Sequence, residues 1–386
     1  MNERITVFRT TPRIIFGIGS LGRVGEEAKA LGAKRALVIT DPGIVKAGLN
    51  KAVEESLSKA GIDFSVFKDV EPEPRIEAVA NCVEVTKKKK SNLLIALGGG
   101  SSIDTAKVTS IMMTNEGKVG DFFGIDLIPQ RGLPKIAIPT TAGSGSEVTP
   151  IAILSDVKEK LKKGIVSPFL FPDVSILDPV LTIGLPPDIT ASTGMDALVH
   201  AIEAYTSINA TYLTDILAFK AMGLIYENLR TAYANGGNLD ARSKMLMASN
   251  LAGIAFANAG VTAVHAFAYP LGAEFHMPHG VANALMLPHV MRFNILGNLG
   301  KFAKTAVAFG ERVENLTRLE SAEVAVKAVE RLANDLSVPR KLRDFEIPET
   351  AIPHLAEGVL KVTRLLANNP RRITLKDAIH IYESAY

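Results

Sequence analysis

Two patterns of hydrophobic positions divide the chain. In its first half, short apolar runs alternate with amphipathic stretches of helical periodicity. The apolar runs are typical of buried strands, and they cover Arg13–Gly17, Ala36–Thr40, Asp63–Phe67, Asn92–Leu97, Lys135–Ile138, Ile151–Leu154 and Val174–Leu177. The helical stretches between the earlier runs are Leu21–Leu31, Asn50–Ala60, Arg75–Lys89 and Ser102–Met113. Strands that alternate with crossover helices predict a parallel α/β sheet, and such sheets bind ligands at the C-terminal ends of their strands.

Only helical periodicity continues beyond Asp178 and Pro179. The predicted helices are Asp188–Thr206, Thr214–Tyr233, Asp240–Ala257, Val261–Leu271, Gly280–Leu296, Leu316–Leu336 and Leu375–Ser384. The turn-rich segment Asp178–Pro187 separates the two patterns. The sequence therefore predicts an N-terminal α/β domain with a parallel sheet over residues 1–182 and an all-α C-terminal domain over residues 183–386.

Composition and charge narrow the class of protein. The 386 residues carry 43 Lys and Arg against 40 Asp and Glu, a net charge of +3. This near-balance gives no electrostatic support for binding to nucleic acid or to a membrane surface. The single cysteine, Cys82, excludes an internal disulfide and favours a reducing compartment. The N-terminal segment has no apolar core of the kind that a secretion signal needs, so we expect a cytoplasmic protein.

A glycine turn follows one of the predicted strands. Gly98, Gly99 and Gly100 come directly after the run LLIAL and directly before a helical stretch that opens with Ser101. Residues without a Cβ let a pyrophosphate approach the backbone, and free N–H groups at a helix N-terminus point at it. The run is not G-x-G-x-x-G, so a purely structural turn is an alternative interpretation.

Further polar residues stand at strand ends of the same domain. Thr140 and Thr141 open a second loop of hydroxyls and glycines after the run KIAIP, and two such loops on one sheet favour a bridged ligand. Asp41 also follows a strand, where a carboxylate can accept hydrogen bonds from an adenosine ribose and repel the additional phosphate of NADP. An Asp that begins a turn before Pro42 has the same appearance. Asp104, in the first turn of a helix, is equally explained by the helix dipole.

A candidate metal site lies in the second domain. Asp196 and His200 are four residues apart on a helical pattern, so their side chains share one face of the helix. An isolated pair of this kind is more often a surface hydrogen bond. The neighbours Ala197, Leu198 and Val199 are apolar, however, which indicates a buried helix on which an Asp and a His need a partner.

The histidines are concentrated in one part of the chain. Five of the seven fall within 90 residues, and these are His200, His265, His276, His279 and His289. A divalent metal would explain the concentration, with two ligands from one helix and two from later segments. One carboxylate with imidazoles suits Fe²⁺, Zn²⁺, Co²⁺ or Mn²⁺. Catalytic Zn²⁺ usually has three protein ligands, so Fe²⁺ is the more natural occupant of a site with four.

Four motifs resemble those of the iron-containing (group III) alcohol dehydrogenases. They are GGGSSIDTAK at 98–107, PTTAGSGSE at 139–147, TGMDALVHAIEAY at 193–205, and HAFAYPLG with MPHGVANALMLPHV between 265 and 290. The resemblance implies a dinucleotide-binding first domain, a metal-binding second domain and a homodimer. It also implies the interconversion of a primary alcohol or diol and its aldehyde by hydride transfer to NAD, with NADP less favoured.

The resemblance assigns roles to individual residues. It implies that the metal ligands are Asp196, His200, His265 and His279, for Fe²⁺ or another divalent ion such as Zn²⁺. It implies that the cofactor contacts are Asp41, Gly98, Gly99, Gly100, Ser101, Thr140, Thr141 and Lys162, to which we add Asp104 as a first-turn acid of the same helix. Lys163 is an alternative match to the family lysine that we assign to Lys162.

Two positions depart from the family pattern. Tyr269 stands where many members have a second histidine that is thought to assist proton transfer, and Tyr, with a reference pKa of about 10, is a poor base. His276 is the nearest other imidazole outside the proposed ligands, so we expect it to exchange the proton; capping or packing at a helix end is the alternative. Glu73 occupies a position that is often Asn or Asp, so a third cofactor contact there is not assumed.

The resemblance leaves two alternative functions to test. In the favoured mechanism, the metal acts as a Lewis acid on the alcohol oxygen while hydride passes from carbon to the nicotinamide. A zinc polyol dehydrogenase similar to glycerol dehydrogenase would keep the fold and change the metal. A non-catalytic protein that binds nucleotide or metal would transfer no hydride.

Overall fold

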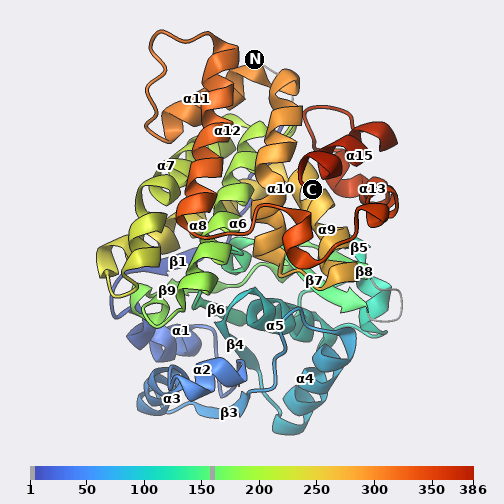
Figure 1. The fold of residues 1–386 in the computed structure, drawn as a ribbon. Helices are drawn as coiled ribbons and strands as arrows, with labels where there is room; N and C mark the ends of the chain where they lie inside the picture. The colour runs from blue at the N-terminus through green and yellow to red at the C-terminus, as the bar shows by residue number, and fades with distance from the viewer. Residues whose placement is uncertain (1–4, 157–160) are drawn as a thin grey trace. The chain divides into compact units, whose positions relative to one another are not determined.

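The structure, a computed structural model, describes residues 5–156 and 161–386. It comprises two compact units (Figure 1). One unit is Thr10–Leu185, and the other is Pro186–Tyr386 together with the described residues before Thr10. The first unit contains the strands, and the described part of the second is helical. The predicted fold class, an α/β domain with a parallel sheet followed by an all-α domain, is therefore confirmed.

A six-stranded sheet forms the centre of the first unit. Its spatial order is β1 (Arg13–Phe16), β9 (Val174–Leu177), β6 (Lys135–Pro139), β4 (Leu93–Gly98), β2 (Arg35–Ile39) and β3 (Asp63–Phe67). Every pairing in it is parallel. The predicted strands match these bounds within one residue at each end, because each is a short apolar run between turn residues.

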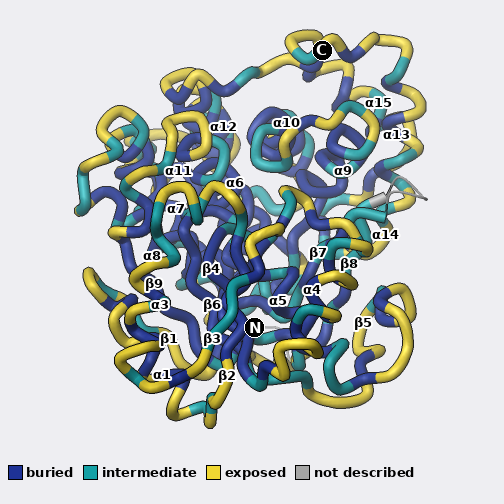
Figure 2. The backbone as a smooth tube through the Cα atoms, turned by 90° about the horizontal axis from the view of Figure 1, so that it is seen from below, coloured by how far each residue is buried: buried dark blue, intermediate teal, exposed yellow. Residues whose placement is uncertain are grey.

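Helices cover both faces of this sheet. They are α1 (Val24–Ala30), α2 (Pro42–Lys46), α3 (Asn50–Lys59), α4 (Ile76–Lys89) and α5 (Gly100–Met112). Val38 and Ile95 pack in a cluster with α1 and α3, whereas their neighbours Leu37 and Leu94 pack with α4 and α5. All four side chains are fully buried, which explains why these strands are continuous apolar runs rather than alternating ones. Figure 2 shows the buried backbone along β4 and β6.

The strand order creates a switch point between β2 and β4. From β2 the chain proceeds to β3 on one side, and from β3 it crosses to β4 on the other side of β2. Parallel α/β sheets bind ligands outside the C-terminal strand ends at such a point. Asp41 follows β2, and the glycine turn at Gly98 follows β4, so the tertiary structure brings these two candidates to the same edge.

A smaller three-stranded sheet adds to the first unit. It consists of β5 (Gly124–Ile125), β8 (Leu161–Val166) and β7 (Ile151–Asp156), and β7 pairs antiparallel with β8. The sequence pattern predicts β7 but neither β5 nor β8. The reason in β8 is its run of Lys162, Lys163 and Gly164, which lacks the apolar character by which strands are identified.

The second unit is built from helices. Its longer members are α6 (Pro187–Thr206), α7 (Tyr212–Ala234), α8 (Leu239–Ala259), α9 (Ala263–Phe275), α10 (His279–Asn294), α11 (Leu299–Ala308), α12 (Arg318–Asp335), α13 (Ile352–Lys361) and α15 (Leu375–Ser384), and α14 (Thr363–Leu366) is a single turn. The sequence pattern does not predict α11, α13 and α14, which are short and lie among turn residues. In α6 every residue from Gly194 to Thr206 is buried.

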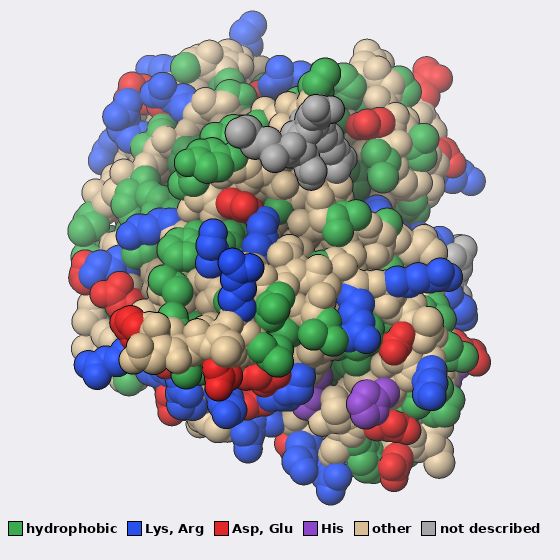
Figure 3. Space-filling model, turned by 90° about the horizontal axis from the view of Figure 1, so that it is seen from above, with side chains coloured by type: hydrophobic (Ala, Val, Ile, Leu, Met, Phe, Trp, Pro, Cys, Tyr) green, Lys and Arg blue, Asp and Glu red, His purple; other side chains and the backbone are tan. Residues whose placement is uncertain are grey.

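The surface of the protein carries charges of both signs. Lys and Arg side chains are interspersed with Asp and Glu over the face drawn in Figure 3, as the near-zero net charge predicts. Within the described residues, no single helix is long and apolar enough to cross a membrane. The bent pair α8 and α9, which meet at 103°, satisfies that criterion only when taken together.

Candidate functional site

Helix α6 presents Asp196 and His200 from its buried face. The two residues are 6% and 5% exposed, so the burial predicted from their apolar neighbours is confirmed. Oδ2 of Asp196 and Nδ1 of His200 are 4.0 Å apart. Gly194 sits on the same helix where a Cβ would lie 2.3 Å from the side chain of Leu229, so close packing against α7 sets the position of α6.

His265 and His279 come from two later helices and meet this pair. His265 lies in the first turn of α9, and His279 is the first residue of α10. The Nε2 atoms of His265 and His200 are 3.1 Å apart. Asp196 Oδ1 is 4.0 Å from His265 Nε2 and 3.8 Å from His279 Nε2. The tertiary structure thus gathers all four side chains that the family resemblance selects.

The chemistry of these donors fits a divalent cation. One ligand atom each from Asp196, His265 and His279 lies within 4.8 Å of the others, and His200 stacks on His265 with ring centroids 4.8 Å apart. Burial raises the pKa of Asp196, but the imidazoles of His200, His279 and His265 outweigh this effect, and the pKa is lowered overall. The carboxylate is therefore ionised, as a metal ligand must be.

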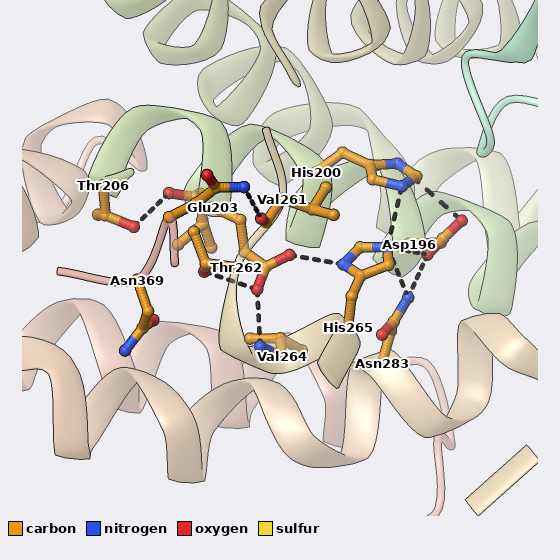
Figure 4. A network of polar contacts seen from close by, with 12 residues as sticks. Asp196, His200, Glu203, Thr206, Val261, Thr262, Val264, His265, Asn283 and Asn369 are labelled. Carbon is orange, nitrogen blue, oxygen red and sulfur yellow. Dashed lines mark hydrogen bonds and ion pairs between the residues drawn. The ribbon is translucent and has the colours of Figure 1, made fainter. Parts of the chain in front are cut away.

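The Glu203 carboxylate contacts the Nδ1 side of the His265 ring. Its Oε2 is 2.5 Å from His265 Nδ1, and its Oε1 accepts from Thr262 Oγ1 at 2.8 Å and from the Val264 N–H at 2.6 Å (Figure 4). An ionised carboxylate only accepts, so His265 Nδ1 carries a proton, and in the neutral imidazole Nε2 then has its lone pair available for a metal. Sequence analysis missed Glu203, although the spacing of three residues from His200 places it on the same helix face.

Asn283 is a second supporting residue that sequence analysis missed. It lies one turn after His279 on α10, fully buried, and its Nδ2 donates to Asp196 Oδ1 at 2.7 Å. The same nitrogen is 3.2 Å from Nε2 of both His265 and His279. Among the described residues, its Oδ1 is buried without a hydrogen-bond partner. The arrangement orients the carboxylate of Asp196 toward the three imidazoles.

The glycine turn of the first unit is shaped for close backbone approach. Gly98 has φ +153°, and a Cβ there would lie 2.4 Å from Ser102 Oγ and 3.3 Å from Asp41 Oδ2. The second polar loop lies against the same turn, because a Cβ at Gly99 would meet Thr141 Oγ1 at 3.5 Å and one at Gly100 would meet Ser144 Oγ at 3.0 Å. The cradle that the two loops form suits a pyrophosphate. The cofactor contacts predicted for these residues, for Ser101 and for Thr140 stay predictions.

The sequence offers two roles for Asp41, a turn residue before Pro42 and a contact with a ribose, and its two carboxylate oxygens differ in this respect. It is the N-cap of α2, where Oδ1 accepts from the N–H groups of Gly43 and Ile44 at 2.8 and 3.0 Å. Its other oxygen, Oδ2, lies beside Gly98. Capping therefore accounts for one oxygen, and the contact of the other with a ribose stays a prediction.

Asp104 has a structural role that the sequence did not indicate. Its Oδ1 accepts from Ser146 Oγ at 2.5 Å and its Oδ2 from the Ile153 N–H at 2.9 Å. Lys107, one turn further along α5, donates to Ser146, to Thr149 Oγ1 at 3.1 Å and to the Ile151 carbonyl at 2.8 Å. Burial lowers the pKa of Lys107 to about 8. Both side chains tie α5 to the second loop, and a direct cofactor contact for Asp104 stays a prediction.

The structure distinguishes the two candidate lysines of β8. Lys162 Nζ is 2.6 Å from Glu73 Oε1, whereas Lys163 Nζ pairs with Asp156 and lies over the ring of Phe123. Successive side chains of a strand point to opposite faces, so of the two lysines Lys162 faces the segment around Glu73. That segment contacts the glycine turn, because the Glu73 N–H donates to Ser101 Oγ at 3.2 Å.

His276 and Tyr269 lie at the end of α9. His276 is exposed, has φ +54° and caps α9 through an N–H that donates to the Leu271 carbonyl. Capping, the alternative weighed in the sequence, is therefore one of its roles, and its proton exchange stays a prediction. The ring centroids of Tyr269 and His279 are 6.2 Å apart. Tyr269, the residue that departs from the family pattern, therefore lies next to one of the proposed metal ligands.

Comparisons with known proteins identify the family. Residues 11–179 match the model described as iron-containing alcohol dehydrogenase, and residues 190–386 match that of the Fe-containing alcohol dehydrogenase family, C-terminal. The chain belongs to the iron-containing alcohol dehydrogenases. As a member, it is an alcohol dehydrogenase that interconverts an alcohol and its aldehyde, and the family predicted from the four motifs is confirmed.

Similar proteins extend over nearly the whole chain. The 1,3-propanediol dehydrogenase of Citrobacter freundii is 43% identical over 373 residues, 96% of each chain. The long-chain-alcohol dehydrogenase 1 of Geobacillus thermodenitrificans is 42% identical and covers 97% of this chain and 96% of its own. A crystal structure of 1,3-propanediol oxidoreductase matches with a TM-score of 0.97 at 41% identity, over 99% of this chain and 100% of the other.

Proposed function

We propose that this iron-containing alcohol dehydrogenase oxidises a primary alcohol or diol with NAD, and reduces the aldehyde in the reverse direction, with Fe²⁺ bound by Asp196, His200, His265 and His279. The observation that carries the proposal is the convergence of one ionised carboxylate and three imidazoles from three buried helices. These donors suit Fe²⁺ among the divalent ions. A cation held there supplies Lewis-acid polarisation of the substrate oxygen.

The protein's own residues prepare this centre. Glu203 holds the proton of His265 on Nδ1, and Asn283 orients the carboxylate of Asp196. The burial of Asp196 and His265 excludes water from around them, which strengthens electrostatic interactions at the reacting atoms. These residues hold the ligands in place before substrate arrives, so little reorganisation is needed during the reaction.

The first unit supplies the cofactor site in this proposal. The turn at Gly98, Gly99 and Gly100 and the loop that begins at Thr140 bind the phosphates, with Lys162 as the nearby cation. Asp41 accepts from the adenosine ribose and disfavours the additional phosphate of NADP by charge repulsion. The position of Asp41 Oδ2 beside Gly98 supports this assignment.

We further infer a cytoplasmic homodimer. Within residues 5–156 and 161–386, strand β1 is an edge strand that pairs with β9 alone, and its Ile14 and Phe16 are 36% and 41% exposed. An exposed edge of this kind is a template for pairing with a second copy. The single, buried Cys82 supports a reducing compartment. Light scattering coupled to gel filtration tests the dimer.

The proposed substrate class, a primary alcohol, is taken from the similar proteins, and an assay can test it directly. The named relatives act on 1,3-propanediol and on long-chain alcohols, which supports a primary alcohol. Protein prepared without oxygen would be analysed for metal and assayed with a panel of alcohols at the absorbance band of reduced nicotinamide. We expect Fe²⁺, and activity that decays in air and returns with reductant and fresh Fe²⁺.

Two results would contradict the proposal. Full activity with Zn²⁺ alone and indifference to oxygen would favour a zinc polyol dehydrogenase of the glycerol dehydrogenase kind. Bound metal and nucleotide without hydride transfer to any alcohol would indicate a non-catalytic binding protein.

A further inference from the structure

An ion pair between Glu73 and Lys162, which are 89 positions apart in sequence, lies beside the proposed cofactor cradle at Gly98–Gly100. Glu73 Oε1 is 2.6 Å from Lys162 Nζ, and the Lys162 side chain is only 8% exposed, whereas that of Glu73 is 42% exposed. The ammonium is therefore sequestered and the carboxylate is accessible to solvent.

The backbone holds the pair in place. Glu73 lies between Pro72 and Pro74 with φ +51°, a left-handed conformation that a residue other than glycine adopts rarely. The Pro74 carbonyl accepts from the Ser155 N–H at 3.0 Å, and Ser155 is the register partner of Lys162 in the β7–β8 ladder. These contacts fix the carboxylate opposite the ammonium.

The same segment touches the first turn of α5. The Glu73 N–H donates to Ser101 Oγ at 3.2 Å, and Ser101 follows the three glycines of the cradle. A phosphate bound at the N-terminus of α5 would thus lie near the Glu73 carboxylate, which already forms an ion pair with the Lys162 ammonium. A negative charge at this place opposes an anionic ligand and neutralises the lysine that would attract it.

We propose that Glu73 restrains cofactor affinity by holding the Lys162 ammonium in the free enzyme, so that NAD(H) must displace the carboxylate when it binds. The inference rests on the proposed function, in which the glycine turn and Lys162 bind the cofactor. Glu73 is a specificity-determining residue in this account: it weakens the binding of every anionic cofactor and weakens NADP(H), with its additional phosphate, the most.

The test measures NADH binding directly, by fluorescence titration or calorimetry, on folded full-length protein. Glu73→Gln keeps the length of the side chain and removes its charge. We expect its dissociation constant for NADH to fall about two- to fivefold at low salt, the range for removing one half-exposed charge from an ion pair. The affinity should also depend more steeply on salt, and the gain for NADPH should be larger than that for NADH.

A matched control lies two residues away. Glu71 forms an ion pair with Arg75 at 2.6 Å and 41% side-chain exposure, so Glu71→Gln removes the same charge from the same segment. It should leave NADH affinity unchanged. An equal gain in both variants would mean that only the general charge of the segment matters, and would overturn the inference.

Lys162→Met separates this inference from the proposed function. If Lys162 binds the cofactor, the variant should bind NADH more weakly. Glu73→Gln should give a smaller gain in this background than in the parent, because only the direct repulsion between its carboxylate and the phosphates remains, and a double-mutant cycle measures the difference. Weakened binding in Lys162→Met together with unchanged or weaker binding in Glu73→Gln would overturn the restraint alone. Unchanged binding in Lys162→Met, or no binding by the parent, would overturn the cofactor site and the restraint together.

Discussion

The Glu203 carboxylate lies 2.5 Å from Nδ1 of His265, and both side chains are almost completely buried. The contact determines which nitrogen of the imidazole bears the proton. Glu203 is not one of the proposed ligands, but through this contact it affects how strongly His265 can donate to a metal. Carboxylate–histidine pairs of this kind typically tune metal affinity.

Replacing Glu203 by Gln tests this connection. The amide oxygen can still accept from Thr262 and Val264, but the amide N–H₂ then faces His265 Nδ1 and favours the tautomer whose Nε2 carries the proton. We expect metal affinity to fall about 10- to 100-fold, measured by competition with a chelator, while NADH affinity stays unchanged. An unchanged metal dissociation constant would show that Glu203 only stabilises the fold.

Removing a proposed ligand should have a larger effect. His279 is half-buried at the start of α10, with 33% of its side chain exposed, so His279→Ala creates little cavity. The variant should lose stoichiometric metal and turnover and keep NADH affinity, because the glycine cradle is unaltered. Metal analysis beside an NADH titration measures both properties, and full metal content with full activity would exclude His279 as a ligand.

Asp41 should set the preference for NAD. Asp41→Gly removes the carboxylate that disfavours the additional phosphate of NADP, so the ratio of kcat/KM for NAD to that for NADP should narrow or reverse. The loss of the α2 cap costs only a few tenths of a kcal/mol of stability when Gly replaces Asp, and Asp41→Asn, which retains capping ability, separates the two effects. Equal kcat/KM values for both cofactors in the parent would show that Asp41 only caps α2.

His276 provides a test of the proton's route. Its φ of +54° suits Asn better than most residues, so His276→Asn removes the imidazole while preserving the cap of α9. If His276 exchanges the proton, this variant should lower kcat and flatten the acid limb of the pH profile at unchanged metal content. Tyr269→His should then partly restore the rate. An unaltered pH profile in His276→Asn would leave solvent or a hydroxyl chain as the proton's route.

Ionisation of the Cys82 thiol should lower the stability of the folded protein at high pH. The thiol is fully buried on α4, and burial raises its pKa from 9.0 to about 12. A pKa raised by folding contributes stability that is fully present below pH 9 and is lost as pH rises toward about 12. Stability measured by urea unfolding should therefore fall less steeply in this range for Cys82→Ala. A native thiol that reacts readily with an aromatic disulfide at pH 8 would contradict its burial.

The elements near the site differ in how well local pattern predicts them. Strands β2 and β4 and helix α6 were predicted because burial on all sides leaves continuous apolar runs or a strong helical period. Strand β8 was missed because Lys162 and Lys163 break its apolar pattern, and their roles depend on partners from other elements. The φ of Glu73 is likewise decided by the contacts of its segment.

The sequence by itself determined the fold class, the glycine turn and the spacing of Asp196 and His200, because periodicity and helix geometry act over a few residues. Only the tertiary structure decided that Asp41 lies beside Gly98, since this depends on the chain crossing β2 on its way from β3 to β4. It also decided that Glu203 and Asn283 support the proposed ligands. Such contacts join distant segments, and no local pattern records which faces will meet when the core is buried.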